Sequence, residues 1–446
     1  MRKKDAIVVG GGLAGLSAAV QLVEKGKDVV VLEYMPHLGG RTANWNEKGM
    51  EVESGLHRYI GYYTALPTLL GKAGIDLDKI IQWEDEIEIR IADTALQADF
   101  GLSVYNLVGT ISGIVGNNNF LTPVEKIRYG IFLTQGLKDY VLNPKMLDTL
   151  SIKAYARNHG LSDKIIQRII EPLSTGIFFL PTDKYSAFVF FGFIVPAFYR
   201  FYQMRIGAFK GGMTDVMIDP IAAYIEKRGG KVRRNSKVEQ LLVKNNKVYG
   251  VQLKNEKIEA SEIIIAASLN PAKDLIRASF KDVKPFKKLL DLPSMPAITV
   301  QIELTKPALE RDLTTFAPGT HLCSFAEQSR TTFKNTKGRL SIILTPAEKF
   351  LKMKEKEILK VVIAEAKRLG IHFERDIKDF RVIAEPVDFY SLTAETEKMR
   401  PEQATHVSGL TLAGDYTKQQ FFCTMEGAVV SGQKAAEIVL GQLSNE

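Results

Sequence analysis

Cysteine is scarce in this sequence of 446 residues, and its scarcity excludes several kinds of protein. Only Cys323 and Cys423 are present, so the chain has no disulfide framework of the kind that holds small secreted domains together. The two cysteines and the six scattered histidines also lack the spacing of a zinc site. We therefore expect a protein without a metal site, held together by an apolar core in a reducing, cytoplasmic compartment.

Long apolar runs are missing as well. A helix that crosses a bilayer needs about 20 apolar residues, and the longest candidate, Ala187–Tyr199, is shorter and contains Pro196. Residues 1–4 and the apolar residues after them superficially resemble a signal peptide, but Asp5 and regularly spaced glycines interrupt the pattern. We expect no membrane-spanning helix, which leaves open a protein that lies on a membrane surface.

The chain also lacks a basic block, although its net charge is +8. Its lysines and arginines are scattered singly among acidic residues, which argues against nucleic acid as a partner. Two explanations of the charge remain, solubility and attraction to an anionic membrane surface. The apolar fraction of 45% is typical of a folded protein, and the length predicts two or three domains.

The N-terminal residues follow the pattern of a dinucleotide-binding strand–helix–strand unit. Residues 6–9 form an apolar strand pattern, and residues 10–15 have the form GxGxxG. Residues 16–25 then have helical periodicity, and residues 28–32 form a second apolar strand pattern. Glu33 follows, where such units carry the acid that binds a ribose hydroxyl, and an acid at this place argues against NADP. Because all these parts occur in register, a plain glycine-rich turn is a poor explanation.

The residues of the glycine-rich turn have separate predicted roles. Gly10 permits the tight turn, Gly12 lets a pyrophosphate approach the backbone, and Gly15 allows the helix to pack closely on the strand. Leu13 and Ala14 lie in the first turn of that helix, whose free N–H groups and positive dipole end face the phosphates. These residues and Glu33 are the first part of a predicted cofactor site.

A second segment narrows the choice of cofactor. Gly39 and Gly40 follow the second strand closely and let the backbone pass near a bulky ligand. Arg41 comes next and is able to offer a charge-assisted, two-pronged contact to a pyrophosphate. The sequence therefore predicts a cofactor that is gripped at two successive turns.

A third segment lies near the C-terminus. Residues 410–413 form an apolar strand pattern that ends in Gly414 and Asp415, and Met425 opens a final helix that runs to about residue 440. The positive end of this helix would stabilise the charge that develops on a flavin during reduction. The three segments together predict FAD rather than NAD.

These blocks resemble the flavin amine-oxidoreductase superfamily. Within it, residues 53–63 are similar to the ETGLH…GAY stretch of plant and cyanobacterial-type phytoene desaturases, and residues 413–432 are similar to their closing block. Residues 208–238 parallel the middle FAD segment of the same enzymes. The resemblance covers the whole chain in outline, with its specificity in these blocks.

The resemblance implies roles for single residues. Val238 would contact the adenine through its backbone, Asp415 would bind the ribityl chain or the pyrophosphate, and the N–H of Met425 would meet the flavin carbonyl. Arg200 matches an active-site arginine. Phe421 departs from the pattern, because the plant enzymes carry tyrosine there, and a role for that hydroxyl does not transfer.

No catalytic acid or base is evident from the residues alone. His57 is the one histidine inside a flavin-associated block, so His57 and Arg200 are the candidate catalytic residues, although a lone histidine is more often structural. Glu426 opens a helix, where an acid is favourable without any catalytic role. Cys423 does not match the position of the cysteine that links flavin in amine oxidases, and we expect no covalent bond.

The flavin motifs fall in three separate stretches, which predicts a discontinuous, α/β Rossmann-type FAD-binding domain. We assign it residues 1–62, 206–270 and 386–446. Residues 63–205 would then form a hydrophobic, helical, membrane-facing insert, and residues 271–385 an α+β substrate domain. Further expected elements are helices over 213–227 and 354–369, strands over 231–233, 263–267, 297–304 and 340–344, and a hairpin over 238–253 that turns at Asn245 and Asn246.

The first insert is unusually apolar, over residues 100–120 and again over residues 178–202. Ordinary core explains one such stretch, but two in a basic protein favour a hydrophobic tunnel with an entrance at the membrane. The basic residues expected at headgroup level are Lys126, Arg128, Lys138, Lys145 and Arg200. We therefore expect peripheral membrane association.

A second GxGxxG is absent, so oxygen, a quinone or another diffusible acceptor must reoxidise the reduced flavin. Our hypothesis is that a hydride moves from an allylic carbon of an isoprenoid hydrocarbon to FAD, with loss of a neighbouring proton and formation of a C=C bond. The alternatives are a hydroxysqualene dehydroxylase or another squalene-type oxidoreductase, an amine oxidase, and a reduced-flavin carotene isomerase. The last alternative is a flavin-binding protein that only carries lipid.

Overall fold

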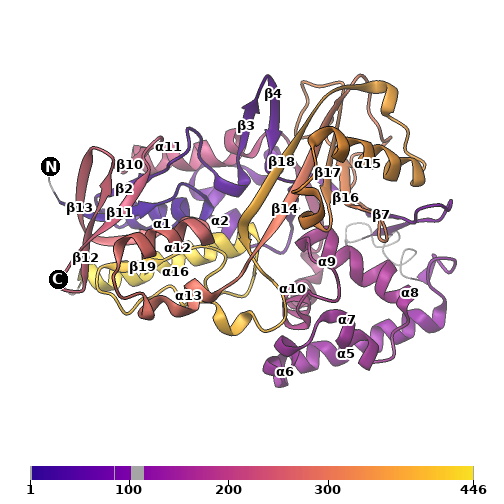
Figure 1. Ribbon diagram of the computed structural model, residues 1–446, viewed down its shortest axis with the longest axis horizontal. Coiled ribbons are helices and arrows are strands. Elements are labelled where there is room, and N and C mark those ends of the chain that lie inside the picture. The colour runs from indigo at the N-terminus through magenta and orange to yellow at the C-terminus, as the bar shows by residue number, and fades with distance from the viewer. Residues whose placement is uncertain (1–2, 85, 102–114, 445–446) are drawn as a thin grey trace.

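A seven-stranded sheet forms the nucleotide-binding side of the molecule (Figure 1). The computed structural model describes residues 3–84, 86–101 and 115–444. Five strands of this sheet run parallel in the order β10-β2-β1-β13-β19, and β12 and β11 extend it antiparallel from the first half of β13. Their bounds are β1 (Lys4–Val9), β2 (Val29–Leu32), β10 (Lys231–Arg233), β11 (Val238–Lys244), β12 (Lys247–Leu253), β13 (Glu256–Ile265) and β19 (Leu410–Leu412).

Three helices cover the parallel strands. α1 (Leu13–Glu24) follows β1 directly, and α16 (Met425–Ser444) packs along it. The approach is close because a Cβ on Gly432 of α16 would lie 2.1 Å from the backbone oxygen of Ala14. α11 (Asp219–Lys227) also packs on α1 and is preceded by a π-helical turn, η5 (Thr214–Ile218). The apolar runs predicted as buried strands are therefore buried between helices.

The hairpin predicted over 238–253 is confirmed. β11 pairs antiparallel with β12, and both turn residues are left-handed, with φ of 49° at Asn245 and 58° at Asn246. Positive φ at both central positions is what a two-residue turn between twisted strands requires, and asparagine tolerates it better than most residues.

A second seven-stranded sheet lies beside the first, in the order β18-β14-β17-β16-β15-β7-β8 (Figure 1). Its two longest strands, the edge strand β18 and its neighbour β14, pair antiparallel, and β17 borders β14 on the other side. The bounds are β7 (Glu86–Arg90), β8 (Gln97–Gly101), β14 (Ser294–Leu304), β15 (Thr315–Phe316), β16 (Leu322–Glu327), β17 (Gly338–Leu344) and β18 (Ile377–Tyr390). α15 (Glu355–Arg368) packs against this sheet, within a residue of the helix expected over 354–369.

Two features of this sheet differ from the expected division of the chain. β7 and β8 belong to the first insert but complete the second sheet. In the same insert, β6 (Ile81–Glu84) pairs with β9 (Ile206–Phe209). The first insert is therefore not purely helical. β18 runs to Tyr390, five residues past the boundary expected at residue 385. Strand pairing over long sequence separations, which local patterns do not encode, causes both differences.

The remainder of the first insert is a cluster of helices at one end of the molecule (Figure 1). Thr122 and Glu125 form a capping box at the start of α5, and Ser186 caps α10 by accepting a hydrogen bond from the N–H of Val189. α10 lies close against α5, since a Cβ on Gly136 would overlap the ring of Phe191. The helices are α5 (Pro123–Leu142), α6 (Pro144–Thr149), α7 (Ile152–Asn158), α8 (Asp163–Ile165), α9 (Glu171–Phe178) and α10 (Ala187–Tyr199).

The apolar stretches of this insert have different outcomes. α10 coincides with the apolar run predicted over Ala187–Tyr199. The stretch predicted over residues 100–120 lies largely outside the described residues, because residues 102–114 are not among them. Within the ranges that the structure describes, no helix is both long and apolar enough to cross a membrane.

Candidate active site

A cavity of about 660 Å³ lies at the carboxyl ends of the parallel strands. Its walls come from the loops after β1, β2, β13 and β19, from strands β14 and β18 of the second sheet, and from helices α9 and α10. Ligands of open parallel sheets bind at this edge, and the volume suits a cofactor or a large substrate. The cavity therefore collects chain segments that are far apart in the sequence.

The glycine-rich turn forms one wall of the cavity. Gly10 has φ of 114°, and a Cβ there would lie 2.8 Å from the backbone of Ala266. At Gly15 a Cβ would lie 2.0 Å from the backbone oxygen of Gly10, so only glycine lets α1 approach β1 this closely. At Gly12 the nearest atom to such a Cβ, the oxygen of Gly39, is 3.8 Å away, so the wall stays open to a ligand on that side. The tight turn at Gly10 and the close packing at Gly15 are thus present, while the pyrophosphate contact at Gly12 stays a prediction.

Glu33 is held rigidly beside this turn. Its Oε2 accepts a hydrogen bond of 2.7 Å from the N–H of Gly11, and its Oε1 accepts one of 2.8 Å from the N–H of Met35. The side chain is buried and lines the cavity. The carboxylate is thus fixed at the end of β2, where the motif predicts a contact to a ribose hydroxyl.

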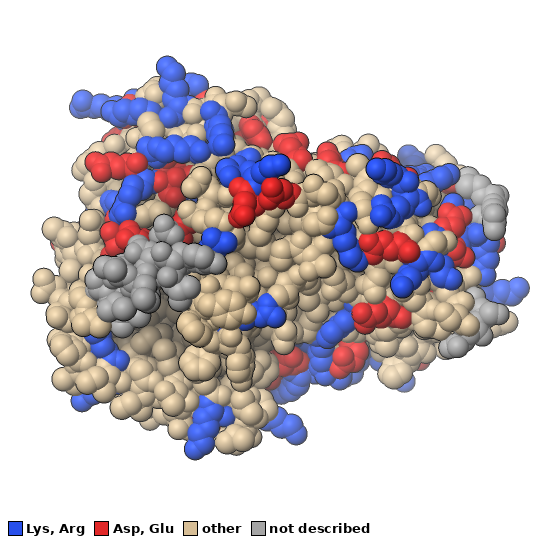
Figure 2. Space-filling view, turned by 180° about the vertical axis from the view of Figure 1, so that it is seen from behind, with Lys and Arg blue, Asp and Glu red and all other residues tan. Residues whose placement is uncertain are grey.

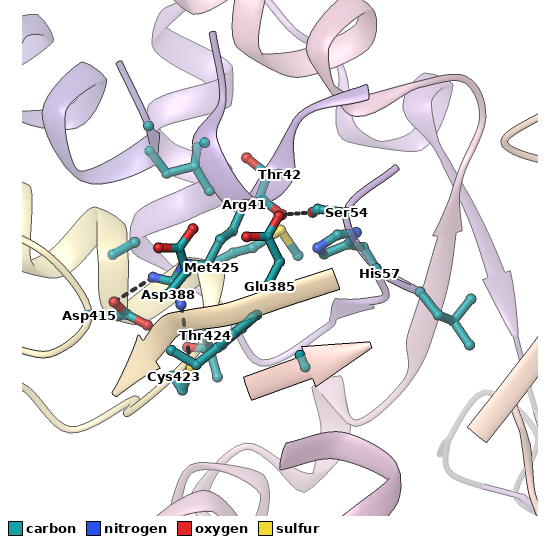
Figure 3. Close-up of a pocket in the computed structure, with 18 of the residues that line it drawn as sticks. Arg41, Thr42, Ser54, His57, Glu385, Asp388, Asp415, Cys423, Thr424 and Met425 are labelled. Carbon is teal, nitrogen blue, oxygen red and sulfur yellow. Dashed lines mark hydrogen bonds and ion pairs between the residues drawn. The ribbon is translucent and has the colours of Figure 1, made fainter. Parts of the chain in front are cut away.

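Arg41 and Asp415 form an ion pair in the middle of the cavity (Figure 3). Nη2 of Arg41 lies 2.6 Å from Oδ1 of Asp415, and the guanidinium also lies over the ring of Phe389, 4.8 Å from its centroid. Burial alone would lower the pKa of Arg41, but Asp415 more than offsets it and the pKa is raised above its ordinary value. Arg41 therefore keeps its positive charge at every accessible pH.

Cys423 lies at the same ion pair, since Nη1 of Arg41 is 3.6 Å from its Sγ. Burial, with a contribution from Asp415, raises the pKa of the Cys423 thiol, so the thiol stays protonated and unreactive near neutral pH. The structure thus places Cys423 on the cavity wall as a neutral group.

Two more carboxyl groups, Glu385 and Asp388, reach the cavity from β18 (Figure 3). The hydroxyl of Ser268 donates to Oδ1 of Asp388 at 3.4 Å. Burial and the neighbouring Asp388 raise the pKa of Glu385 to about 8. Sequence patterns gave no sign of these two residues, because no motif surrounds them.

Met425 and His57 also line the cavity (Figure 3). Met425 begins α16, so the positive end of that helix faces the cavity. Nδ1 of His57 lies 3.9 Å from Oε2 of Glu53, a carboxylate that is almost fully buried. Beside them, the hydroxyl of Ser54 donates to the backbone oxygen of Arg41 at 2.5 Å. His57 is thereby placed on the cavity wall with an acid behind it.

Another part of the cavity wall is apolar. The side chains there come from α9, the residues after it, α10 and the second sheet, and none is charged. They include Leu173, Ile177, Phe178, Phe179, Phe193, Phe316 and Ile343. A polar cofactor and an apolar substrate would therefore have separate parts of one continuous space.

Three predicted site residues are not on the cavity wall. Gly15 lies behind the turn, against Gly10 and Val8, and of the described residues neither Arg200 nor Val238 lines the cavity. Arg200 ends α10, is half-buried and donates to the backbone oxygen of Tyr62 at 3.4 Å. Val238 begins β11 and is half-buried. The roles of Arg200 and Val238 came from the resemblance alone, and they stay predictions.

Glu426 was expected to act only as an acid at the start of its own helix, but it also contacts a second helix. Its side chain is fully buried and accepts hydrogen bonds from the N–H groups of Thr64, Ala65 and Leu66, at 2.7, 2.7 and 2.8 Å. It therefore caps the N-terminus of a different helix, α2 (Ala65–Lys72). No local signal could have revealed this contact across some 360 residues of sequence.

The comparison with known families settles the class of cofactor. Residues 13–440 match the family model described as flavin containing amine oxidoreductase. The chain belongs to this family. The oxidoreductase therefore holds a flavin, and the open glycine wall, the fixed acid, the buried arginine and the helix end described above fit such a ligand.

Relatives of this flavin amine oxidoreductase are similar along its full length. It is 28% identical to the chloroplastic 15-cis-phytoene desaturase of Solanum lycopersicum, covering 98% of this chain and 77% of the relative. It is 25% identical to the 15-cis-phytoene desaturase of Synechococcus elongatus, covering 98% and 95%. A solved oxidoreductase from Methanosarcina mazei shares its fold, with a TM-score of 0.77 at 19% identity over 97% of this chain and all of that one.

Proposed function

We propose that this flavin amine oxidoreductase is an FAD-dependent carotene desaturase that forms a C=C bond in an isoprenoid hydrocarbon. The observation that carries the proposal is its full-length similarity to enzymes named 15-cis-phytoene desaturases. The apolar half of the cavity supports it, because a hydrocarbon of this kind offers no polar group for recognition and needs a long apolar wall.

FAD is the flavin that the residues fit best, since the two motifs at Glu33 and Arg41 suit the adenosine and pyrophosphate parts that smaller flavins lack. Bound FAD supplies the hydride acceptor of the reaction. The residues proposed to hold it are Gly10, Gly12, Leu13, Ala14, Gly15, Glu33, Gly39, Gly40, Arg41, Val238, Gly414, Asp415 and Met425. The proposed division of the chain follows from these contacts, with the three FAD-binding stretches assigned above and two inserts between them.

Removal of a hydride and a proton from adjacent carbons leaves the new double bond, so the proton needs an acceptor. His57 is our candidate, because its imidazole lies on the cavity wall and Glu53 lies behind it. Arg200 is proposed to act on the electron acceptor. That acceptor would be a quinone or oxygen, because the sequence carries no second dinucleotide motif.

Arg41→Ala tests the proposed pyrophosphate contact. Charge-assisted hydrogen bonds contribute about 1.5–3 kcal/mol each, so we expect the Kd for FAD to rise about 10- to 100-fold. Arg41→Lys keeps the charge without the planar fork and should lie between the variant and the wild type. The measurement is titration of the apo-protein with FAD, followed by flavin fluorescence. If Arg41→Ala leaves the Kd for FAD unchanged, Arg41 does not contact the cofactor.

We also propose that the helical end of the protein rests on an anionic membrane surface. Large apolar side chains on α5, α6, the end of α10 and the turn after it are exposed to solvent, a pattern that marks interaction surfaces. They are Val124, Ile127, Ile131, Val141, Leu142, Met146, Phe198, Tyr199, Phe201 and Tyr202, of which Tyr199 is 73% exposed. On the face seen in Figure 2 this end, at the lower left, is largely uncharged with basic side chains around it.

The basic residues expected at headgroup level divide into two groups. Arg128, Lys138 and Lys145 are exposed on α5 and α6. Lys126 donates hydrogen bonds to Val115, Gly116 and Asn118 instead, and the half-buried Arg200 donates to the backbone oxygen of Tyr62. The proposed surface therefore relies on the first three for its attraction to anionic lipid. Because the apolar part of the cavity is built from α9 and α10, such a surface would bring its substrate end close to lipid.

Replacement of Phe198, Tyr199, Phe201 and Tyr202 by serine tests this surface. Membrane affinity grows with the apolar area that is buried, so we expect at least about tenfold weaker sedimentation with phosphatidylserine vesicles at low salt. Leu351→Ser, at an exposed site in another part of the molecule, is the matched control and should bind as the wild type does. Wild-type protein that ignores these vesicles would contradict the membrane proposal.

Turnover tests the reaction itself. Purified protein, loaded with FAD and given phytoene in liposomes with a quinone, should yield products with absorption at longer wavelength, one quinone reduced for each new double bond. Conversion of hydroxysqualene to squalene, with no action on phytoene, would instead favour the squalene-type alternative.

A further inference from the structure

The pairing between β18 and β14 is interrupted inside the cavity. Phe389 pairs with Met295 and Glu385 pairs with Ala297, so three residues of β18, 386–388, oppose Pro296 alone. Both strands carry a proline in this interval, Pro296 and Pro386, and proline has no N–H to give to the ladder. The result is a β-bulge, a feature that redirects side chains and is frequent beside active sites.

The bulge brings two acids together. Residues three apart in a regular strand point to opposite faces of the sheet. Here Glu385 and Asp388 both line the cavity, where Asp388 is near enough to raise the pKa of Glu385 (Figure 3). The two prolines therefore determine where Asp388 points, and the acid pair is a built feature of the cavity wall.

Two adjacent carboxylates repel each other when both are ionised, so a proton on one of them is favourable and also supplies a hydrogen-bond donor between them. The nearby Arg41 does not remove this need, since its guanidinium is already bonded to Asp415 at 2.6 Å. Partial burial and the adjacent Asp388 raise the pKa of Glu385 to about 8, above the neutral range. At neutral pH Glu385 therefore holds a proton.

The pair faces the polar part of the cavity. The ionisable groups that line this part with it are Glu33, Tyr34, His37, Arg41, Glu47, Asp415 and Cys423. Burial, with Asp388 and Glu33, raises the pKa of Tyr34, and burial also raises that of Cys423, while burial lowers that of His37 below its ordinary 6.5. None of these three changes charge between pH 7 and 9.5, so the pair is the group expected to titrate there.

We propose that Glu385 and Asp388 form a one-proton carboxyl pair, and that this proton lets the pyrophosphate of FAD bind beside them. The inference rests on the proposed function only in taking FAD as the ligand. Two acids beside the predicted pyrophosphate contact of Arg41 would repel a doubly anionic ligand if both were ionised. The proton removes one of the two negative charges of the pair and so lowers this repulsion.

The proposal gives FAD affinity a definite pH dependence. FAD binding needs Glu385 in its protonated form. The affinity for FAD is therefore highest below the pKa of Glu385 and falls as the pH rises through that pKa. Above about pH 8 the Kd for FAD should rise about tenfold per pH unit, because one proton must be taken up for binding. Riboflavin has no phosphate, and its weaker binding should not change between pH 7 and 9.5.

The experiment is titration of the apo-protein with FAD and with riboflavin from pH 7 to 9.5, followed by flavin fluorescence. Glu385→Gln replaces the acid O–H by an amide N–H that does not titrate, so its Kd for FAD should be constant over this range. Asp388→Asn removes the neighbouring negative charge, which should move the break in the wild-type curve to lower pH. Asp379→Asn changes a more exposed acid of the same strand outside the cavity wall and should reproduce the wild-type curve.

Two outcomes overturn the proposal. One is a wild-type Kd that stays constant from pH 7 to 9.5, and the other is a wild-type slope that persists in Glu385→Gln. If Glu385→Gln fails to fold, judged by its thermal midpoint, the shift of the break in Asp388→Asn decides. Protein that binds no FAD at any pH would refute the proposed function itself, whereas pH-independent FAD binding refutes the acid pair alone.

Discussion

Glu426→Ala is expected to lower the free energy of unfolding by about 3–5 kcal/mol. The carboxylate is fully buried, and besides the three backbone N–H groups of residues 64–66 it accepts from the hydroxyl of Thr64 at 3.1 Å. Truncation leaves these donors buried without an acceptor and removes the negative charge that balances the dipole of α2. Because α2 packs on α16, we expect the loss to spread to the helix that carries Met425.

Urea unfolding of the apo-protein measures this effect. Glu426→Gln keeps the shape and one acceptor oxygen and should lose roughly half as much stability. The matched control is Glu437→Ala, an exposed acid on the same helix, for which we expect a change of less than about 0.5 kcal/mol. Equal stability of Glu426→Ala and Glu437→Ala would show that the buried contacts contribute nothing.

Gly15→Ala should weaken FAD binding about 10- to 100-fold. The added Cβ would lie 2.0 Å from the backbone oxygen of Gly10 and 3.1 Å from Cγ1 of Val8, so α1 must move away from β1. Overpacking of this kind costs about 1–3 kcal/mol, and the movement displaces the N-terminus of α1 from the phosphates. The measurement is again fluorescence titration of the apo-protein with FAD.

Gly441→Ala is the control for this substitution, because α16 has open space for a Cβ at that position. Alanine also has the higher helix propensity, so we expect unchanged FAD affinity and equal or greater stability. If Gly15→Ala binds FAD as tightly as this control does, close packing of α1 on β1 is not what positions the cofactor.

The parts of the fold that the sequence predicted correctly are local. β1, α1 and β2 follow from apolar periodicity and glycines within some 30 residues, and the hairpin at Asn245 and Asn246 follows from its turn residues. Strand pairings over long separations did not follow, because the pattern of β7 or β18 does not state its partner. The assignment of residues 81–101 to a helical insert failed for this reason.

The residues of the candidate site also divide into those that the sequence predicted and those that it did not. The motif residues from Gly10 to Arg41 and from Gly414 to Met425 gather at one cavity, because each motif carries its own strand, turn and helix. Glu385 and Asp388 have no motif, and only a bulge set by two prolines brings their side chains together. The pattern around Glu426 indicated the start of α16, whereas its side chain caps α2. Local patterns do not reveal the partners of charged residues when those partners lie hundreds of positions away.

Anaerobic mixing of the FAD-loaded protein with phytoene in liposomes, without any electron acceptor, tests the central claim most directly. We predict that the visible absorbance of the flavin is lost and that one new double bond forms for each flavin reduced. Altered carotene with the flavin still oxidised would contradict the account and indicate isomerisation without net electron transfer. Flavin that keeps its absorbance with phytoene but loses it with an amine would contradict the account in favour of an amine oxidase.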